Sequence, residues 1–294
     1  MSLFSRTARV TCWRETMPAD STKFNVSRLP NATEITDLRI QFKVRRALTK
    51  NPDQADVTIT NLAPTTRADL ETKPLLVQLE AGYEDLPRLL FMGDLRFGMT
   101  RLASPNWETL LQVGDGDCHH RWSRVSRSYA PGTTIRTVLR ETARSMGLEL
   151  PQALATDPAL DKQLVGGDAA YGPARDKLTE HLAALGYHWC IQNGRLQVLR
   201  DDQVASGVAL PIDEEKGMIG SPEYGSPPRN GKPPHIHVRS LLYPELMPGC
   251  LVKLTSKVKT GLFRVENVEH TGDTHGTGDD SWTTKVEIKP FSQG

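Results

Sequence analysis

Cysteine and histidine side chains in three parts of the chain have the chemistry of metal ligands, but their spacing does not favour a metal site. The run Cys118–His120 is contiguous, and adjacent residues on a strand point to opposite faces. His235 and His237 would share one face of a strand, yet a third ligand would have to come through the fold from His270 or His275. Zinc requires three or four ligands. We therefore expect no metal centre. Cys118–His120 is predicted to be a solvated strand end, and His235 and His237 are predicted to lie on the polar surface of a barrel.

Two groups of carboxylates raise the possibility of glycoside cleavage, which uses two acidic side chains across a sugar cleft. They are the pair Asp115 and Asp117 and the run Asp213–Glu215. The sequence indicates no cleft between them, and acidic runs commonly lie in solvated loops. A cell-wall hydrolase stays open as an alternative function.

Nucleotide and acyl-transfer motifs are incomplete. Between Gly225 and Gly231 lie five residues where a phosphate-binding loop has four, and Pro233 stands where a Ser or Thr would bind magnesium. His119 stands where a dinucleotide fingerprint beginning at Gly114 needs its third glycine. The chain has no G-x-S-x-G nucleophile elbow. We expect no cofactor and no enzymatic activity.

Composition narrows the function further. The 294 residues carry 36 Lys+Arg against 35 Asp+Glu, a formal net charge of +1, which argues against a protein whose main work is neutralising nucleic-acid phosphates. A cytosolic nucleic-acid-binding β-barrel protein is nevertheless kept as a second alternative. No stretch approaches the roughly 18 apolar residues of a membrane span, so we expect no membrane insertion. Four separated cysteines predict reduced thiols and synthesis in the cytosol.

Residues 1–128 have the pattern of a β domain. Apolar and charged residues alternate within Ile35–Leu48, which predicts a half-exposed strand, and a turn at Asn51 leads to a second strand at 55–60. This 35–60 hairpin is expected to offer open edges to other chains. Further elements are predicted as a helix at 65–71 opened by Pro64, and strands at 75–83, 88–97 and 107–113.

The middle and end of the chain divide into three more segments. Residues 129–204 form a predicted ααββ insert, with helices at 135–146 and 172–186 and strands at 187–192 and 195–199 joined by Asn193-Gly194. Residues 205–234 are rich in Gly, Ser and Pro and are predicted to be a linker or loop. Residues 235–294 return to a β pattern. The fold class predicted is mainly β (α+β), with two tube-like β-barrel domains around the insert.

The two β regions share a weak internal repeat. Gly93–Phe97 and Gly261–Val265 both follow G-x-apolar-R-apolar, and Trp107–Leu111 and Trp282–Val286 both follow W-x-T-x-apolar. If the repeat is real, one chain carries two similar β units. A homotrimer then presents six units and has pseudo-sixfold symmetry about a threefold axis.

Segments from both β regions and the insert resemble one family, in matching order along most of the chain. They are Leu38–Val44, Ala55–Leu62, Leu79–Tyr83, Phe91–Asp94, Trp107–Asp117, Ala130–Ile135, Leu246–Val252, Gly261–Val265 and His270–Gly276. Together they resemble the phage tail baseplate hub proteins, of the late control or tail protein D type. Each segment alone is a loose pattern.

The resemblance implies a structural role. Family members form a trimeric ring that closes the distal end of the tail tube, with the tube protein above and a central spike or tip protein below. The tape-measure protein and later the DNA, in transit, occupy the lumen, and other baseplate proteins dock around the ring. The implied location is the virion tail baseplate or tip, in a phage or a tail-like injection particle, after synthesis in the host bacterial cytoplasm. Under the same resemblance, the alternative hydrolase would be a tail-associated cell-wall hydrolase.

Basic residues mark the candidate interface. The expectation is that they contact an acidic partner surface, which adds specificity and encounter rate. The candidates on or beside the first hairpin, and those after the first β region, are Arg39, Lys43, Arg45, Lys50, Asn51, Arg124 and Arg127.

Overall fold

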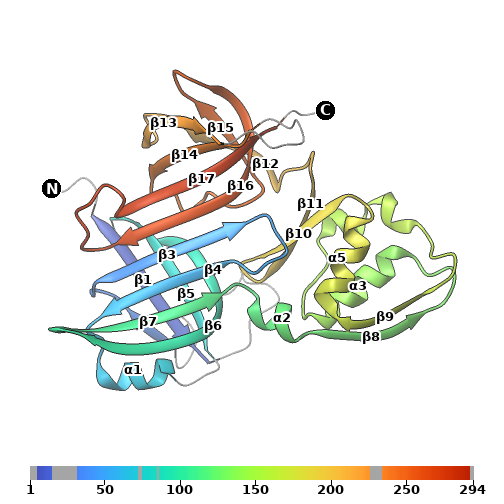
Figure 1. Ribbon diagram of the computed structural model, residues 1–294, viewed down its shortest axis with the longest axis horizontal. Helices are drawn as coiled ribbons and strands as arrows, with labels where there is room; N and C mark the ends of the chain where they lie inside the picture. The colour runs from blue at the N-terminus through green and yellow to red at the C-terminus, as the bar shows by residue number, and fades with distance from the viewer. Residues whose placement is uncertain (1–4, 15–31, 72–74, 85, 226–233, 292–294) are drawn as a thin grey trace.

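The computed structural model describes residues 5–14, 32–71, 75–84, 86–225 and 234–291. Within these ranges the protein is mainly β, as the sequence predicts (Figure 1). Thirteen of the described strands form one sheet, which runs through both β regions. A smaller lobe with helices projects from one side of it (Figure 1).

The N-terminal half of the sheet is built from residues before the insert. In β3 the apolar Ile40, Phe42 and Val44 are buried and alternate with half-exposed or exposed polar residues, which gives the strand one core face and one polar face. Pro64 opens the helix α1 as predicted. The elements are β1 (Arg6–Trp13), β2 (Thr33–Ile35), β3 (Ile40–Ala47), β4 (Gln54–Thr60), α1 (Pro64–Glu71), β5 (Leu76–Tyr83), β6 (Arg88–Ala103) and β7 (Asn106–Gly114).

The C-terminal half of the sheet begins earlier than the sequence suggested. Residues 205–234, predicted as a linker or loop, contain β12 and β13, while 226–233 lie outside the described residues. Pairing with β15 and β14 stabilises these strands, and their irregular registers hid them from a search for alternation. The elements are β12 (Ser206–Ile212), β13 (Met218–Tyr224), β14 (Ile236–Leu241), β15 (Cys250–Thr255), β16 (Thr260–Asp273) and β17 (Trp282–Pro290).

Strand order repeats between the two halves. The sheet runs β3-β4-β7-β6-β5 in one half and β13-β14-β17-β16-β15 in the other. Each of these strands in the first half therefore has a counterpart in the second half whose label is higher by ten. The long hairpins β6–β7 and β16–β17 each carry a register shift, at Arg96 and at Glu266. Counted from these bulges, Trp107 matches Trp282, as the sequence repeat predicts. Gly93, however, matches Phe263 and not Gly261.

The two halves join edge to edge. Strand β16 pairs with β15 through Arg264 and then continues as the antiparallel neighbour of β3, from Asn267 opposite Ala47 to Asp273 opposite Gln41. Figure 1 shows these two strands side by side at the centre of the molecule. The described strand pairings follow an open path through both halves and close neither into a separate barrel.

The insert has a hydrophobic core of its own, with Leu139, Leu178 and Trp189 among its buried residues. Beyond the predicted helices and hairpin it contains β8 and β9, which pair with each other. In β8 the residues between Val125 and Tyr129 are exposed, so neither strand nor helix periodicity is visible there. The elements are α2 (Asp117–Trp122), β8 (Arg124–Tyr129), α3 (Ile135–Ser145), α4 (Gln152–Ala155), η3 (Pro158–Asp161), β9 (Asp168–Pro173), α5 (Ala174–Ala183), β10 (Tyr187–Gln192) and β11 (Arg195–Arg200).

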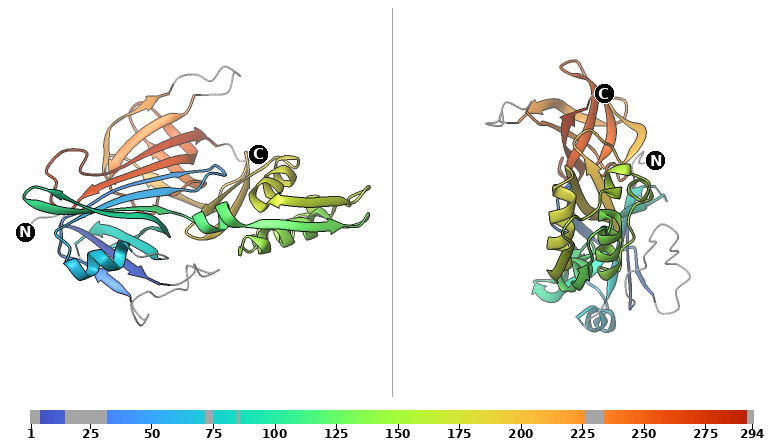
Figure 2. Two further views of the ribbon diagram at one scale, coloured as in Figure 1. Left: turned by 60° about the horizontal axis from the view of Figure 1, so that its bottom comes forward. Right: turned by 90° about the vertical axis from the view of Figure 1, so that its right-hand side faces the viewer.

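The insert and the β6–β7 hairpin extend from opposite ends of the molecule (Figure 2). Among the helices in the described ranges, none is long and apolar enough to span a membrane.

Candidate assembly interface

Basic residues of the predicted interface hairpin are paired within the chain. Lys43 Nζ lies 3.0 Å from Glu269 Oε2, and Arg45 Nε lies 3.5 Å from the same oxygen. Glu269 belongs to β16, directly opposite Arg45. These cations therefore help to hold the two halves together, and β3 and β4 each have a strand on both sides. The expectation that this hairpin offers open edges is wrong.

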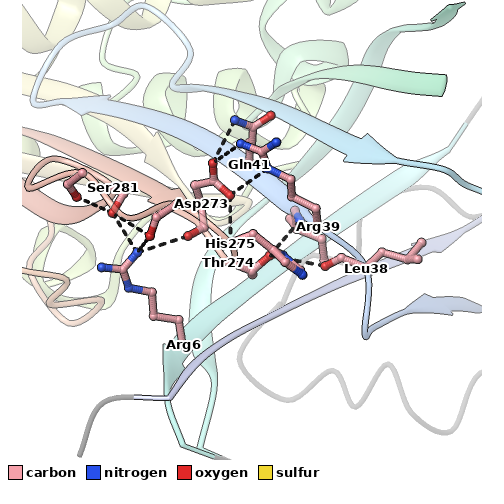
Figure 3. Close-up of polar contacts among 11 residues, drawn as sticks. Arg6, Leu38, Arg39, Gln41, Asp273, Thr274, His275 and Ser281 are labelled. Carbon is pink, nitrogen blue, oxygen red and sulfur yellow. Dashed lines mark hydrogen bonds and ion pairs between the residues drawn. The ribbon is translucent and has the colours of Figure 1, made fainter. Parts of the chain in front are cut away.

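Asp273 forms a second polar link at the end of β16 (Figure 3). Arg39 binds its carboxylate through two hydrogen bonds, Nε to Oδ1 at 3.2 Å and Nη2 to Oδ2 at 2.7 Å, and Gln41 donates to Oδ2 at 3.0 Å. Partial burial raises the pKa of Asp273, but hydrogen bonds from Arg39, the His275 N–H and Gln41 outweigh it and leave the pKa below its ordinary value. Arg6 of β1 donates to Ser281 Oγ at 2.7 Å from the other side of the loop.

The polar face of the sheet forms a broad hollow of about 890 Å³ over β3, β4, β13, β14, β16 and β17. Charged residues of both signs stand side by side there, because the register aligns them in rows perpendicular to the strands. One row contains Gln54, Arg45, Glu269, Lys285 and Arg239. The next contains Asn267, Glu287, His237 and Glu223. The surface is therefore strongly polar but mixed in sign.

The remaining interface candidates lie apart from this face or at its border. Lys50 and Asn51, at the β3–β4 turn, line a hollow of about 340 Å³ together with Arg175 of the insert. Arg124 is exposed at the start of β8. Arg127 pairs with Glu141 of α3, Nη1 to Oε2, at 3.1 Å. The structure thus divides the predicted residues between the sheet and the insert.

A buried polar network attaches the insert to the sheet. Asp115, fully buried just after β7, accepts hydrogen bonds from the N–H groups of Asn193 and Gly194, the latter at 2.8 Å. Arg46 of β3 donates to the Gln192 and Asn193 side chains. Burial raises the pKa of Asp115 to about 7, although Arg46 and the two N–H groups oppose that rise. The Asn-Gly turn predicted from the sequence is the part of the insert that this network holds.

The other side chains singled out for chemistry have structural surroundings. Asp117 is buried and pairs with Arg96 at 2.7 Å and with Arg121 at 2.9 Å. The Asp213 carboxylate accepts a hydrogen bond from the Lys216 N–H at 2.8 Å in a turn. Cys118–His120 lies on the helix α2 and not at the end of a strand. Across the part of the chain that the structure describes, no three His, Cys, Asp or Glu side chains are placed to hold a metal ion.

His270 makes the link between the halves sensitive to acid. It is fully buried on β16 with Nδ1 2.9 Å from Thr284 Oγ1, and burial, aided by Arg46, lowers its pKa to about 3. Below pH 6.5 the unfolded chain binds a proton here that the folded chain does not, so the folded state loses stability as the pH falls toward 3. We expect the stability gap between the protein and its His270→Gln variant to narrow by about 1.4 kcal/mol per pH unit below the ordinary histidine pKa. Urea unfolding of both proteins at several pH values measures this gap.

Apolar side chains are exposed on the far part of the β6–β7 hairpin, a surface that the sequence analysis did not single out. Phe97 and Met99 are exposed on one face of β6. Leu102 and Trp107 stand opposite each other near the tip, with exposed fractions of 59% and 43%. The Trp-x-Thr repeat was the available signal, because it marks Trp107 and Trp282 as equivalent positions. In the structure only the second copy is buried: Trp282 is 2% exposed.

Comparison with known proteins identifies the fold. No protein-family model matches the chain, and no curated protein sequence matches it. Solved structures do: a tail protein from Neisseria meningitidis has 11% identity and a TM-score of 0.61, with 97% of each chain covered. The 43 kDa tail protein of prophage MuSo2 from Shewanella oneidensis has 7% identity and a TM-score of 0.62, with 98% of this chain and 97% of that chain covered.

A third similar structure comes from a related kind of assembly. It is a component of the Escherichia coli type VI secretion system, described as structurally similar to bacteriophage T4 tail proteins, with 13% identity and a TM-score of 0.58 over 87% of this chain and 74% of that chain. The chain therefore has the fold of phage tail and tail-like proteins. The resemblance drawn from the sequence is confirmed at the level of the fold.

Proposed function

We propose that this protein is a structural hub subunit of a phage tail or tail-like injection particle, acting by assembly and not by catalysis. The observation that carries the proposal is the repeated strand order of the two halves. Three copies of such a chain supply six similar β units, which matches a threefold ring to a sixfold tail tube. The shared fold with tail proteins supports the same conclusion.

The proposed partners are those that the resemblance to hub proteins implies. One side of the ring contacts the tail tube protein and the other a central spike or tip protein, in the baseplate or tip of the virion. The insert projects from the sheet and suits docking of other baseplate proteins. The mixed-sign hollow suits a lumen through which the tape-measure protein and DNA pass, because opposite charges in its rows give a polyanion little net attraction.

Neither alternative function gains an observation in its favour. The hydrolase needs two carboxylates at a cleft, but Asp115 and Asp117 are buried in internal hydrogen bonds and ion pairs. The nucleic-acid-binding protein needs uncompensated cations, but Lys43 and Arg45 share Glu269. A hub is the function that the described geometry supports best.

Imaging of the purified protein tests the proposal. We expect threefold rings with an open centre in negative-stain micrographs at high concentration, either alone or with the protein encoded immediately downstream, because obligate assemblies dissociate on dilution. Sedimentation across a concentration series checks the mass of the particles. Single monomers in both samples at every concentration would remove the central prediction of a hub.

A further inference from the structure

The link between the halves is a built example of how one β unit covers the next. In β16, residues 267–273 extend beyond the last pair with β15, and β3 covers their free edge through residues 41–47. Phe42 of β3 packs on the ring of Trp282 with centroids 5.3 Å apart. Trp282 is consequently almost fully buried.

No described strand covers the matching edge on the N-terminal half, where helix α1 packs against β6 and Arg67 lies over the ring of Trp107 at 4.7 Å. Strand β5 pairs with β6 only as far as Asp94, and residues 97–103 of β6 have β7 on one side and no described strand on the other. Trp107 occupies the position of Trp282 in the repeat but is 43% exposed against 2%. The difference in exposure marks a surface from which a strand like β3 is missing.

The counterpart of β3 in the strand order is β13. It is the last strand of its half, and in the described ranges it pairs on one side with β14. Counted from the two tryptophans, Lys43 matches Glu223 and Val44 matches Tyr224. The partners of Lys43 and Val44 on β4, and the partners of Glu223 and Tyr224 on β14, lie opposite matching residues of β7 and β17. Glu223 and Tyr224 are both exposed.

We propose that β13 of one copy of this chain pairs antiparallel with residues 97–103 of β6 in the next copy. Transferring the register of β16 and β3 places Arg101 opposite Glu223 of the neighbouring copy, and Thr100 opposite its Tyr224. Arg101 has an exposed side chain that now contacts Glu108 at 2.8 Å. Opposite charges directly across a strand pair are stabilising.

Side-chain size fits the same arrangement. Within the chain, the large Phe42 of β3 faces the small Gly272 of β16. Between copies, the small segment Gly220–Pro222 of β13 would face the large Leu102 of β6. Large and small residues exchange sides, so the space across the strand pair is filled in both cases.

The edge of β13 is also protected against indiscriminate pairing. Pro222 lacks an N–H group, Glu223 is charged, and the strand is bulged, all of which are features that limit pairing with unrelated strands. Contact between β13 of one copy and β6 of the next is head-to-tail, so it yields a closed ring or an open filament. The number of copies rests on the proposed function, whereas the pairing itself does not.

Disulfide trapping between two variants, each with one added cysteine, tests the pairing. Both carry Cys118→Ser, because Cys118 is exposed. One adds Arg101→Cys and the other Glu223→Cys. Directly opposed residues on paired strands lie within disulfide range, so the mixture should give a covalent dimer under mild oxidation, while each variant alone should give little. Arg88→Cys mixed with Glu223→Cys is the matched control, since Arg88 lies on the part of β6 that β5 covers.

Charge exchange supplies the second arm. Arg101→Glu and Glu223→Arg should each weaken self-association about tenfold, and the double variant should recover most of that loss. Thermal unfolding of the dilute protein separates this effect from loss of folding. Trapping no greater than the control at millimolar protein, or failure of the double variant to recover, overturns the inference.

The outcomes for the pairing and for the hub differ. Rings that form without a cross-link between positions 101 and 223 of neighbouring copies would overturn the pairing and leave the ring intact. Cross-linked chains that grow into open filaments instead of rings would uphold the pairing and contradict the trimeric ring.

Discussion

Asp115→Ala is expected to lower the free energy of unfolding by about 3–5 kcal/mol, the range for removing one member of a buried charged network. The carboxylate is fully buried and accepts the Asn193 and Gly194 N–H groups. Truncation leaves both donors buried without an acceptor, and it removes one of the two buried carboxylates, Asp115 and Asp53, that interact with the charge of Arg46. Urea unfolding followed by tryptophan fluorescence measures the loss.

The pattern among variants separates this network from a general loss of packing. Asp115→Asn keeps the shape and one acceptor oxygen, so it should fall between the protein and Asp115→Ala. Asp279→Ala, in an exposed loop, should change the free energy by less than about 0.5 kcal/mol. Equal stability of Asp115→Ala and Asp279→Ala would show that the network does not hold the insert to the sheet.

Local patterns predicted local structure well. The alternation in β3 and the Asn193-Gly194 turn each depend on neighbours in sequence, and the structure has both. Strand β13 was missed because its register shifts between Ile219 and Glu223, so no period of two runs through it. Its pairing with β14 supplies what the local pattern lacks.

The role of the basic residues could not be predicted from the sequence. Arg39 and Lys43 appear free along the chain, because Asp273 and Glu269 stand more than two hundred positions away. Only the pairing of β3 with β16 brings these charges together. The repeat contained the missing information, since it implies that one β unit packs on the next, but it did not say which strands meet.

Gly272→Leu is expected to destabilise the link between the halves by about 1–3 kcal/mol, the range for overpacking a core. A Cβ atom at Gly272 would stand 2.1 Å from Cζ of Phe42, whose ring is held against Trp282. Phe42→Ala alone should cost about 3–5 kcal/mol by leaving a cavity. In the double variant the leucine enters the space that the phenylalanine leaves, so its loss should be smaller than the sum by at least about 1 kcal/mol.

This double-mutant cycle reproduces inside one chain the exchange of large and small residues proposed between copies, where Leu102 faces Gly220–Pro222. Gly278→Ala is the control, because a Cβ there meets no atom within 4 Å. Strictly additive losses would mean that Phe42 and Gly272 do not fill one shared space, and the size argument for the contact between copies would fail with them. A loss in the double variant that is smaller than the sum of the single losses would show that this sheet edge accepts the large residue on either strand, as two similar units in one ring require.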